Sequence, residues 1–379
     1  MSFLKRITCL AAAMFAAVGL CPETNAGAPD VSAKAAVLIE ADSGRLIFGK
    51  NENARLSMAS TTKIMTALLL LQNCRPDQTI DVTPEMIAVE GSSMGLAAGD
   101  RVNRDALLYG MLLSSGNDAA NAAAYMVSGG KDEFVSLMNK TAADMGCKDT
   151  SFETPSGLDG ENHYSTAADM ARIAQAAMQN DDFAFAAEQR QATVTFGEPP
   201  TSRTLKNHNR LLSLYDGCCG IKTGFTKKSG RCLVSCAVRG GVKLICVTLN
   251  APDDWDDHMK LYDYGFSLLE RYTPESDVLP GTIAVTGGEA EFVPVEHSLP
   301  ALTLNRGDGK RMIIKVYAPG FLYAPVKYGQ VIGHAEYVLD GETIAELTLT
   351  AGDDVDIRKS EKKPSLWQGI GDFFARLFG

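Results

Sequence analysis

The alternation of hydrophobic and polar positions divides the chain into stretches of different character. From Ala35, the sequence AAVLIEADSGRLIFGKN alternates and is interrupted at Asp42-Ser43-Gly44, which predicts two strands joined in a hairpin. The run STTKIMTALLLLQ, which begins at Ser60, is apolar on every side and longer than a typical strand, so it predicts a buried helix. Residues 104–127 and 131–145 continue in helical periods, and we expect a mostly helical middle section.

Strand-like patterns return beyond residue 190. They are ATVTF, CGIKTGF, CLVSCAVRG and VKLICVTLNA, and Gly240-Gly241 joins the last two like a hairpin. The segment DDWDDHMKLYDYGFSLLERY then restores a helical period. A chain that begins and ends in sheet with helices between predicts one α/β sandwich domain, which we assign to residues 27–272.

The last hundred residues have a different sequence pattern. Short alternating runs separated by Gly, Pro and Asp predict a small all-β domain over residues 273–352, and the charged residues 353–364 predict a linker. Residues 365–379 predict an amphipathic helix, too short for the ~20 residues of a bilayer span. Its apolar positions are Leu366, Trp367, Ile370, Phe373, Phe374, Leu377 and Phe378. We expect this helix to lie in a membrane interface, assisted by Arg358, Lys359, Lys362 and Lys363; docking on its own domain is the alternative.

The first 26 residues have the layout of a secretory signal peptide. A basic pair, Lys5-Arg6, precedes an apolar stretch that ends at Cys21, and small residues surround Ala26, after which we place cleavage. A retained anchor is disfavoured because the apolar stretch is short. Lipidation of Cys21 is disfavoured because Leu20 precedes it, where such signals want a small residue. We therefore expect an exported protein at the outer face of the cytoplasmic membrane.

Charge and cysteine usage exclude several other classes. A formal net charge of −10 and the lack of a basic stripe argue against nucleic acid as a partner. After cleavage seven cysteines remain, an odd number at irregular spacing, so we expect buried free thiols rather than a disulfide framework. The adjacent pair Cys218-Cys219 fits zinc ligation poorly, and the acids at 253–257 fit a helix start better than a calcium site. We predict no metal and no cofactor.

The candidate chemistry begins with a serine and a lysine three residues apart. This pattern starts at Ser2, Ser60, Ser128 and Ser360, but only Ser60 opens a buried helix. Lys63 then lies one turn later on the same face. A serine needs an adjacent base to become a nucleophile, and a neutral lysine can serve. Burial and a second cation, which Lys222 offers, would both lower the pKa of Lys63.

Two further motifs follow in a meaningful order. Ser115-Gly116-Asn117 stands at a break in helical sequence, and Lys222-Thr223-Gly224 stands in a strand-like run where glycine permits close backbone approach. Each alone has a structural explanation, such as a helix cap. The sequence Ser-x-x-Lys, Ser-x-Asn, Lys-Thr-Gly is the motif order of penicillin-binding proteins and class A β-lactamases.

With these motifs, the segments ASTTKIMTALL, SGNDAANAAA, TPSGLDGENHYSTAADMARIA, NHNRLL and DGCCGIKTGFT resemble the D-alanyl-D-alanine carboxypeptidases among the low-molecular-mass penicillin-binding proteins. The resemblance covers residues 30–270 strongly and the remainder more loosely. It implies a serine β-lactamase/transpeptidase-like fold and a two-step acyl transfer on peptidoglycan stem peptides ending in D-Ala-D-Ala. It also implies that β-lactam antibiotics are inhibitors.

The resemblance also implies residue roles. Ser60 is the nucleophile, Lys63 its base, and Ser115 relays a proton to the leaving amine. The backbone N–H groups of Ser60 and Phe225 form the oxyanion hole, although family members often carry His at the latter position. The substrate-binding residues are Asn117 for an amide, Lys222 and Thr223 for the terminal carboxylate, Gly224 on the same strand, and Arg210 as an assistant to the carboxylate. His163 has no proton to move and is interpreted as structural.

Three alternatives differ in class. A class A β-lactamase would need an extra glutamate for deacylation, and Glu153 lies in a segment, FETPSGL, that looks like the carboxypeptidases instead. A D,D-endopeptidase acting on cross-links would use the same residues and stays open. A non-catalytic wall-binding protein is disfavoured because the complete set of motif residues is present.

Overall fold

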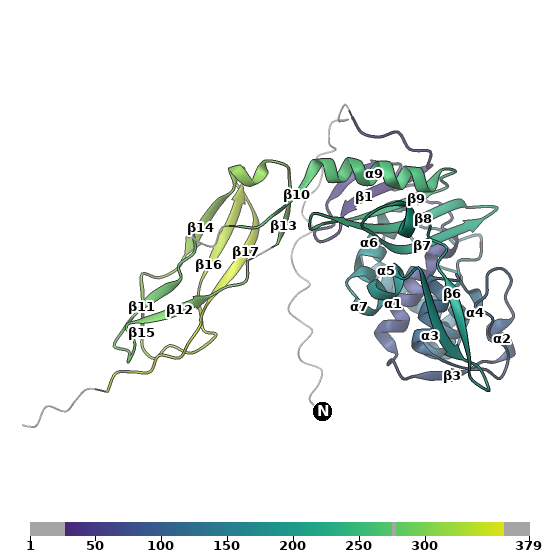
Figure 1. Ribbon diagram of the computed structural model, residues 1–379, viewed down its shortest axis with the longest axis horizontal. Coiled ribbons are helices and arrows are strands. Elements are labelled where there is room, and N and C mark those ends of the chain that lie inside the picture. The colour runs from purple at the N-terminus through teal and green to yellow at the C-terminus, as the bar shows by residue number, and fades with distance from the viewer. Residues whose placement is uncertain (1–26, 275–277, 300, 360–379) are drawn as a thin grey trace, which may run out of the picture. The chain divides into compact units, whose positions relative to one another are not determined.

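The computed structural model describes residues 27–274, 278–299 and 301–359 (Figure 1). Our predictions for the signal peptide, the end of the linker and the amphipathic tail fall on residues outside these ranges. Within them, no helix combines the length and the apolar character that crossing a bilayer requires. Contacts divide the chain into two units, the second of which comprises residues from Gly265 onward together with Glu40–Ser43 and Val238–Leu244.

The first unit contains a five-stranded sheet in the order β2-β1-β9-β8-β7. These strands are β1 (Ala35–Glu40), β2 (Leu46–Lys50), β7 (Cys218–Thr226), β8 (Gly230–Arg239) and β9 (Val242–Leu249). The antiparallel pairing of β1 with β2 confirms the predicted hairpin. Two further pairs stand apart from this sheet: β3 (Thr79–Asp81) with β4 (Arg101–Asn103), and β5 (Gln191–Phe196) with β6 (Thr201–Lys206).

Helices cover both faces of the five-stranded sheet (Figure 1). On one face lies α9 (Asp254–Leu268), from which Tyr262 and His258 reach the hydroxyl of Ser235 on β8. On the other face lie α1 (Lys63–Asn73), α3 (Arg104–Leu112), α4 (Asn117–Ser128), α5 (Lys131–Asp144), α6 (Ala167–Met178) and α7 (Asp181–Glu188). The short helices are α2 (Pro84–Ile87) and α8 (Leu211–Leu214). The α/β sandwich expected from the sequence is therefore confirmed.

The buried helix is confirmed, but its start differs from our prediction. Every residue of α1 from Lys63 to Leu71 is buried. Ser60 itself lies in a preceding 3-10 turn, Ala59–Thr62, rather than in the α-helix. The hydroxyls of Thr61 and Thr62 donate to the carbonyls of Met58 and Ala59, and these bonds favour the tighter turn. The helical pattern of 104–127 is likewise divided into α3 and α4 around Ser115.

The acids at the start of α9 are held by protein donors. The carboxylate of Asp257 accepts hydrogen bonds from the backbone of Ser32 and Ala33 and from the Ser32 hydroxyl. Asp254 forms an ion pair with Arg231 at 2.7 Å. None of the seven cysteines in the described ranges forms a disulfide.

Beyond α9, the described part of the second unit consists of β-strands and their connections, with a 3-10 turn at Asp308–Arg311. Its main sheet has the order β14-β16-β17-β12-β11-β15. Those strands are β11 (Thr282–Thr286), β12 (Phe292–Glu296), β14 (Ile313–Tyr317), β15 (Phe321–Tyr323), β16 (Val331–Leu339) and β17 (Glu342–Ala351), and β10 (Leu269–Tyr272) pairs with β13 (Leu302–Asn305). Only residues 318–320 join the two edge strands, so the sheet curls around a core that includes Val293, Tyr337 and Leu349. This confirms the predicted small all-β domain.

Candidate active site

The turn that carries Ser60 has an unusual backbone conformation, and the segment at 154–157 packs against it. Ala59 has φ 48°, in the left-handed region that costs a non-glycine residue energy. Gly157, itself at φ 88°, lies so close that a Cβ atom there would sit 2.0 Å from the carbonyl oxygen of Ala59. The turn and the segment at 154–157 are thus packed backbone to backbone, which only glycine permits.

Lys63 lies within hydrogen-bonding distance of three groups. Its Nζ atom is 3.0 Å from Ser60 Oγ, 2.7 Å from Asn117 Oδ1 and 2.6 Å from the carbonyl oxygen of Ser156. The side chain is fully buried. Burial lowers the pKa of Lys63 well below its usual range, and the Lys222 cation lowers it further, whereas Asp118 opposes the shift. Lys63 is therefore driven toward its neutral form.

The junction between α3 and α4 positions the second motif. Ser115 adopts φ 58° and is buried, and Asn117 begins α4. The Asn117 amide nitrogen donates to the carbonyl oxygen of Glu90 at 2.6 Å, so its oxygen is oriented toward Lys63. The next residue, Asp118, accepts hydrogen bonds from the Ser93 hydroxyl and from the backbone N–H groups of residues 94–96. This carboxylate holds the loop that precedes β4 against the motif.

Strand β7 brings the third motif next to Ser60. A Cβ atom at Gly224 would lie 3.1 Å from the backbone nitrogen of Ser60, so the strand passes next to that N–H group. Lys222 is 1% exposed, donates to the carbonyl oxygen of Thr223 at 2.8 Å, and has its pKa lowered by burial to about 7. Phe225 follows with its side chain 68% exposed.

Backbone strain marks each motif. Ala59, Ser115 and Ile221 are non-glycine residues with positive φ, and each belongs to or immediately precedes one of the three motifs. At Ile221, φ is 107°, an outlier for a β-branched residue, and the pairing of β7 with β8 shifts register just before it. Such strain persists only where surrounding structure imposes it, and it concentrates at functional sites.

His163 supports the turn that carries Ser60 through a chain of hydrogen bonds. Its Nδ1 accepts a hydrogen bond from the backbone N–H of Glu153, so the proton resides on Nε2, which donates to Thr62 Oγ1 at 2.8 Å. Thr62 in turn donates to the carbonyl oxygen of Ala59. Burial lowers the pKa of His163 to about 4 and keeps the ring neutral.

The geometry therefore joins Ser60, Lys63, Asn117 and β7, and it adds contributors that sequence reasoning missed. The carbonyl of Ser156 and the space left by Gly157 act through the backbone, and the only sequence signal for them was the segment TPSGL. Arg210 is not brought into this network. It is exposed at the start of α8, and its side chain makes no hydrogen bond or ion pair that the described part of the chain records.

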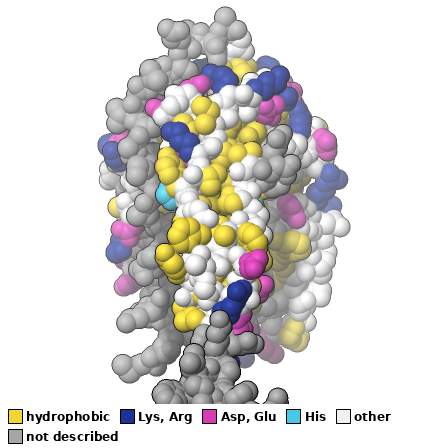
Figure 2. All heavy atoms as spheres, turned by 90° about the vertical axis from the view of Figure 1, so that its left-hand side faces the viewer, with side chains coloured by type: hydrophobic (Ala, Val, Ile, Leu, Met, Phe, Trp, Pro, Cys, Tyr) yellow, Lys and Arg dark blue, Asp and Glu magenta, His cyan; other side chains and the backbone are white. Residues whose placement is uncertain are grey.

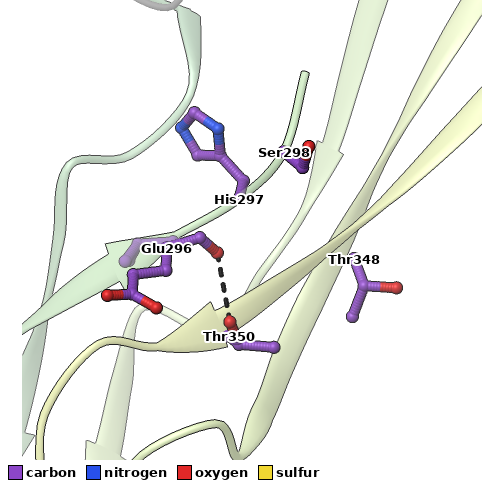
Figure 3. A pocket seen from close by; sticks show the side chains of 6 residues that line it. Glu296, His297, Ser298, Thr348 and Thr350 are labelled. Carbon is purple, nitrogen blue, oxygen red and sulfur yellow. Dashed lines mark hydrogen bonds between the residues drawn. The ribbon is translucent and has the colours of Figure 1, made fainter. Parts of the chain in front are cut away.

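A surface hollow in the second unit lacks comparable chemistry. It is lined by Glu296, His297 and Ser298 at the end of β12 and by Thr348 and Thr350 on β17 (Figure 3). The Thr350 hydroxyl donates to the carbonyl oxygen of Glu296 at 3.3 Å. None of the three motifs contributes to it, so the candidate site is the one around Ser60.

Comparison with known proteins agrees with this assignment. The model of the D-alanyl-D-alanine carboxypeptidase family matches residues 22–253, and that of the penicillin-binding protein 5 C-terminal domain matches residues 271–356. The D-alanyl-D-alanine carboxypeptidase DacF of Bacillus subtilis is 32% identical over 85% of this chain and 86% of its own. DacC of Escherichia coli is 31% identical over 90% of this chain and 89% of its own.

Solved structures show the same architecture. Penicillin binding protein 5 from Haemophilus influenzae aligns with a TM-score of 0.65 at 28% identity, covering 86% of this chain and 98% of that one. The carboxypeptidase DacD from Francisella tularensis aligns with a TM-score of 0.63 at 26% identity, covering 87% and 95%. On this evidence, the chain belongs to the D-alanyl-D-alanine carboxypeptidase family of serine peptidases.

Proposed function

We propose that this enzyme removes the terminal D-alanine from peptidoglycan stem peptides through an acyl-enzyme on Ser60. The observation that carries the proposal is the set of neighbours around Lys63 Nζ. A neutral amine has two N–H groups and one lone pair, and two of its three neighbours, Asn117 Oδ1 and the Ser156 carbonyl, can only accept. The lone pair is thereby left for the third neighbour, the Ser60 hydroxyl at 3.0 Å.

Acylation then proceeds as a proton transfer coupled to nucleophilic attack. Lys63 takes the Ser60 proton while Ser60 Oγ bonds to the carbonyl carbon of the penultimate D-alanine. The N–H groups of Ser60 and Phe225 stabilise the resulting oxyanion, and the position of Gly224 beside the Ser60 nitrogen supports this pairing. The C–N bond breaks, and the proton returns from Lys63 through Ser115 to the departing amine.

Hydrolysis of the ester repeats the same steps with water. Lys63 removes a proton from the water molecule, the hydroxide adds to the ester carbon, and Ser60 leaves with the proton. Glu153, the residue that a class A β-lactamase mechanism would require, is exposed, and its carboxylate accepts from the Asn162 backbone at 3.1 Å. This favours a lysine-based scheme and a carboxypeptidase over a β-lactamase.

Substrate binding uses the remaining motif residues. The terminal carboxylate binds Lys222 and Thr223, and an anion there stabilises the charged form of a lysine whose pKa burial has lowered to about 7. Asn117 donates one amide proton to Glu90 and retains a second for a substrate carbonyl. Arg210 is exposed at the start of α8, and we propose for it an auxiliary role at the carboxylate.

Mass spectrometry after a brief incubation with benzylpenicillin tests the nucleophile. We expect a one-to-one adduct on the wild type and on Ser128→Ala, the matched control from the other described Ser-x-x-Lys pattern, but not on Ser60→Ala. An adduct on Ser60→Ala would refute the assignment. D-alanine release from a pentapeptide, compared with cleavage of a cross-linked dimer, then separates carboxypeptidase from endopeptidase action.

We also propose that the enzyme is exported and associates peripherally with the membrane through residues 365–379. The composition of that segment supports this, since aromatic and aliphatic residues recur at helical spacing after a basic stretch. A chain ending at Lys363 should bind vesicles much more weakly than the full chain while keeping penicillin acylation. If the shortened chain binds vesicles as well as the full chain does, the tail is not the anchor.

A further inference from the structure

The second unit exposes a row of aromatic side chains. On β11, Ile283 and Val285 point into the core, so Ala284 between them faces outward. Ala284 pairs with Phe321 on β15 and with Phe292 on β12, which places both rings on the same outer face. Their exposed fractions are 48% and 57%. About half of each residue is therefore left in contact with solvent.

The row continues into a larger apolar surface. Tyr323 is 72% exposed and lies edge-to-face with Phe321, with 5.2 Å between the ring centroids. Val278 and Val316 are exposed at the adjoining hollow, which Phe292 also lines. We call the following residues the aromatic patch: Val278, Ala284, Phe292, Val316, Phe321 and Tyr323. Figure 2 shows hydrophobic side chains gathered on the surface of this unit.

The size of the patch indicates that something contacts it. An aromatic side chain carries about 150–250 Å² of surface, so three rings at these exposures leave roughly 300 Å² of aromatic surface in water. Continuous apolar surfaces of several hundred Å² mark interaction sites on soluble proteins. Tyrosine is enriched at lipid–water interfaces, and phenylalanine is among the residues that interfacial segments bury there.

The course of the chain indicates what the patch contacts. Ile357 forms a bridge with Gly288, and the Arg358 N–H donates to the carbonyl oxygen of Gly287 at 2.9 Å. Gly287 directly follows β11, the strand at the centre of the patch. The last residues that the structure describes therefore lie beside the end of β11, only a few positions before the amphipathic sequence 365–379. A surface that binds that sequence is separated from the patch by no more than this short stretch of chain.

We propose that the aromatic patch is a second membrane contact, which inserts into the interface of an anionic bilayer beside the tail. The inference rests on the proposed membrane association of residues 365–379. Charges near the patch are mixed. The acidic residues Glu289 and Glu291 lie in the turn between β11 and β12, and the basic residues Arg358 and Lys359 lie in the segment that pairs with the start of that turn. Binding through the patch is therefore apolar and resists salt, whereas attraction of the basic stretch to anionic lipid is screened.

Vesicle sedimentation of the mature full chain tests the proposal. The probe is phosphatidylethanolamine–phosphatidylglycerol vesicles, and the variants are Phe292→Ser/Phe321→Ser/Tyr323→Ser and the milder Tyr323→Ser. Phe185→Ser is the matched control, because Phe185 is 59% exposed on α7 of the first unit. We expect the triple variant to lose at least about tenfold in partition coefficient at high salt, the single variant less, and the control nothing.

Additional readouts separate the outcomes. In a Trp255→Phe background, Trp367 is the remaining tryptophan, and a blue shift of its emission on adding vesicles reports tail insertion. If the tail still inserts and the triple variant partitions like Phe185→Ser, the patch proposal is wrong while the tail anchor stands. If the wild type binds no vesicles, both are wrong. Penicillin acylation of every variant should match the wild type and shows that the first unit is folded.

Two other occupants of the patch would overturn the proposal. The Trp367 emission could already be shifted to the blue without vesicles and return to the longer wavelength of a solvent-exposed tryptophan in the triple variant. That result would show that the tail is docked on the patch. A dimer in light scattering that the triple substitution converts to a monomer would show a second copy of the chain there.

Discussion

Gly157→Ala offers a direct test of how the turn that carries Ser60 is positioned. At Gly157 an added Cβ atom would lie 2.0 Å from the carbonyl oxygen of Ala59, 2.6 Å from its carbonyl carbon and 2.9 Å from Thr62 Oγ1. Ordinary van der Waals contact begins near 3.4 Å, so the turn or the 154–157 segment must move by more than 1 Å. Both are packed backbone, so neither can rotate a side chain away. Movement of the turn displaces Ser60, which is covalently attached to Ala59, and movement of the segment displaces the Ser156 carbonyl that accepts from Lys63.

The expected cost follows from that displacement. Misplacing a reacting group by about 1 Å lowers a rate by about 10²-fold, so we expect acylation by benzylpenicillin to slow by that amount. Overpacking costs about 1–3 kcal/mol of stability, and the left-handed backbone adds about 1–2 kcal/mol. The measurements are the second-order acylation rate from intact mass against time, and the free energy of unfolding in urea.

Gly129→Ala is the matched control. Gly129 also has a left-handed φ of 74°, but no atom lies within 4 Å of the position its Cβ would take. Its alanine variant carries the backbone strain without the collision, so it should lose about 1–2 kcal/mol of stability and acylate normally. Equal acylation rates for the two alanine variants would refute the argument that Gly157 positions Ser60.

Other predictions concern charge and buried polar groups. Lys222→Gln removes a cation that lowers the pKa of Lys63, so the acid limb of the acylation pH profile should move to higher pH; an unmoved limb would contradict the coupling. Burial lowers the pKa of His258 to about 3 in the folded chain, whereas the same histidine has its usual pKa of about 6.5 in the unfolded chain. Between these two pH values, the unfolded chain carries a proton on this histidine and the folded chain does not. This histidine should therefore cost about 1.4 kcal/mol of unfolding free energy per pH unit on acidification, and urea titrations of wild type and His258→Gln should diverge accordingly. Thr62→Val leaves the His163 N–H unpaired and should cost about 1–3 kcal/mol in thermal unfolding; an unchanged melting temperature would show that this bond contributes nothing.

Local pattern predicted most of the secondary structure because its causes are local. The hairpin at Asp42-Ser43-Gly44, the buried helix after Ser60 and the small β domain each follow from a periodicity or a turn signal. The helix start was misplaced because the hydroxyls of Thr61 and Thr62 tighten one turn, and an apolar pattern does not report side-chain bonds to the backbone.

The residue types of the candidate site were readable in the chain, since Ser60, Lys63 and Lys222 stand in motifs of fixed spacing. The protonation state of the two lysines could not be predicted from these motifs, because it depends on the groups that folding places around them. The pKa of Lys63 is lowered by burial in packed helices and by a cation from a strand distant in sequence. The Ser156 carbonyl and the missing Cβ of Gly157 are backbone features, which have no signature among side chains and acquire their role only when the chain is packed.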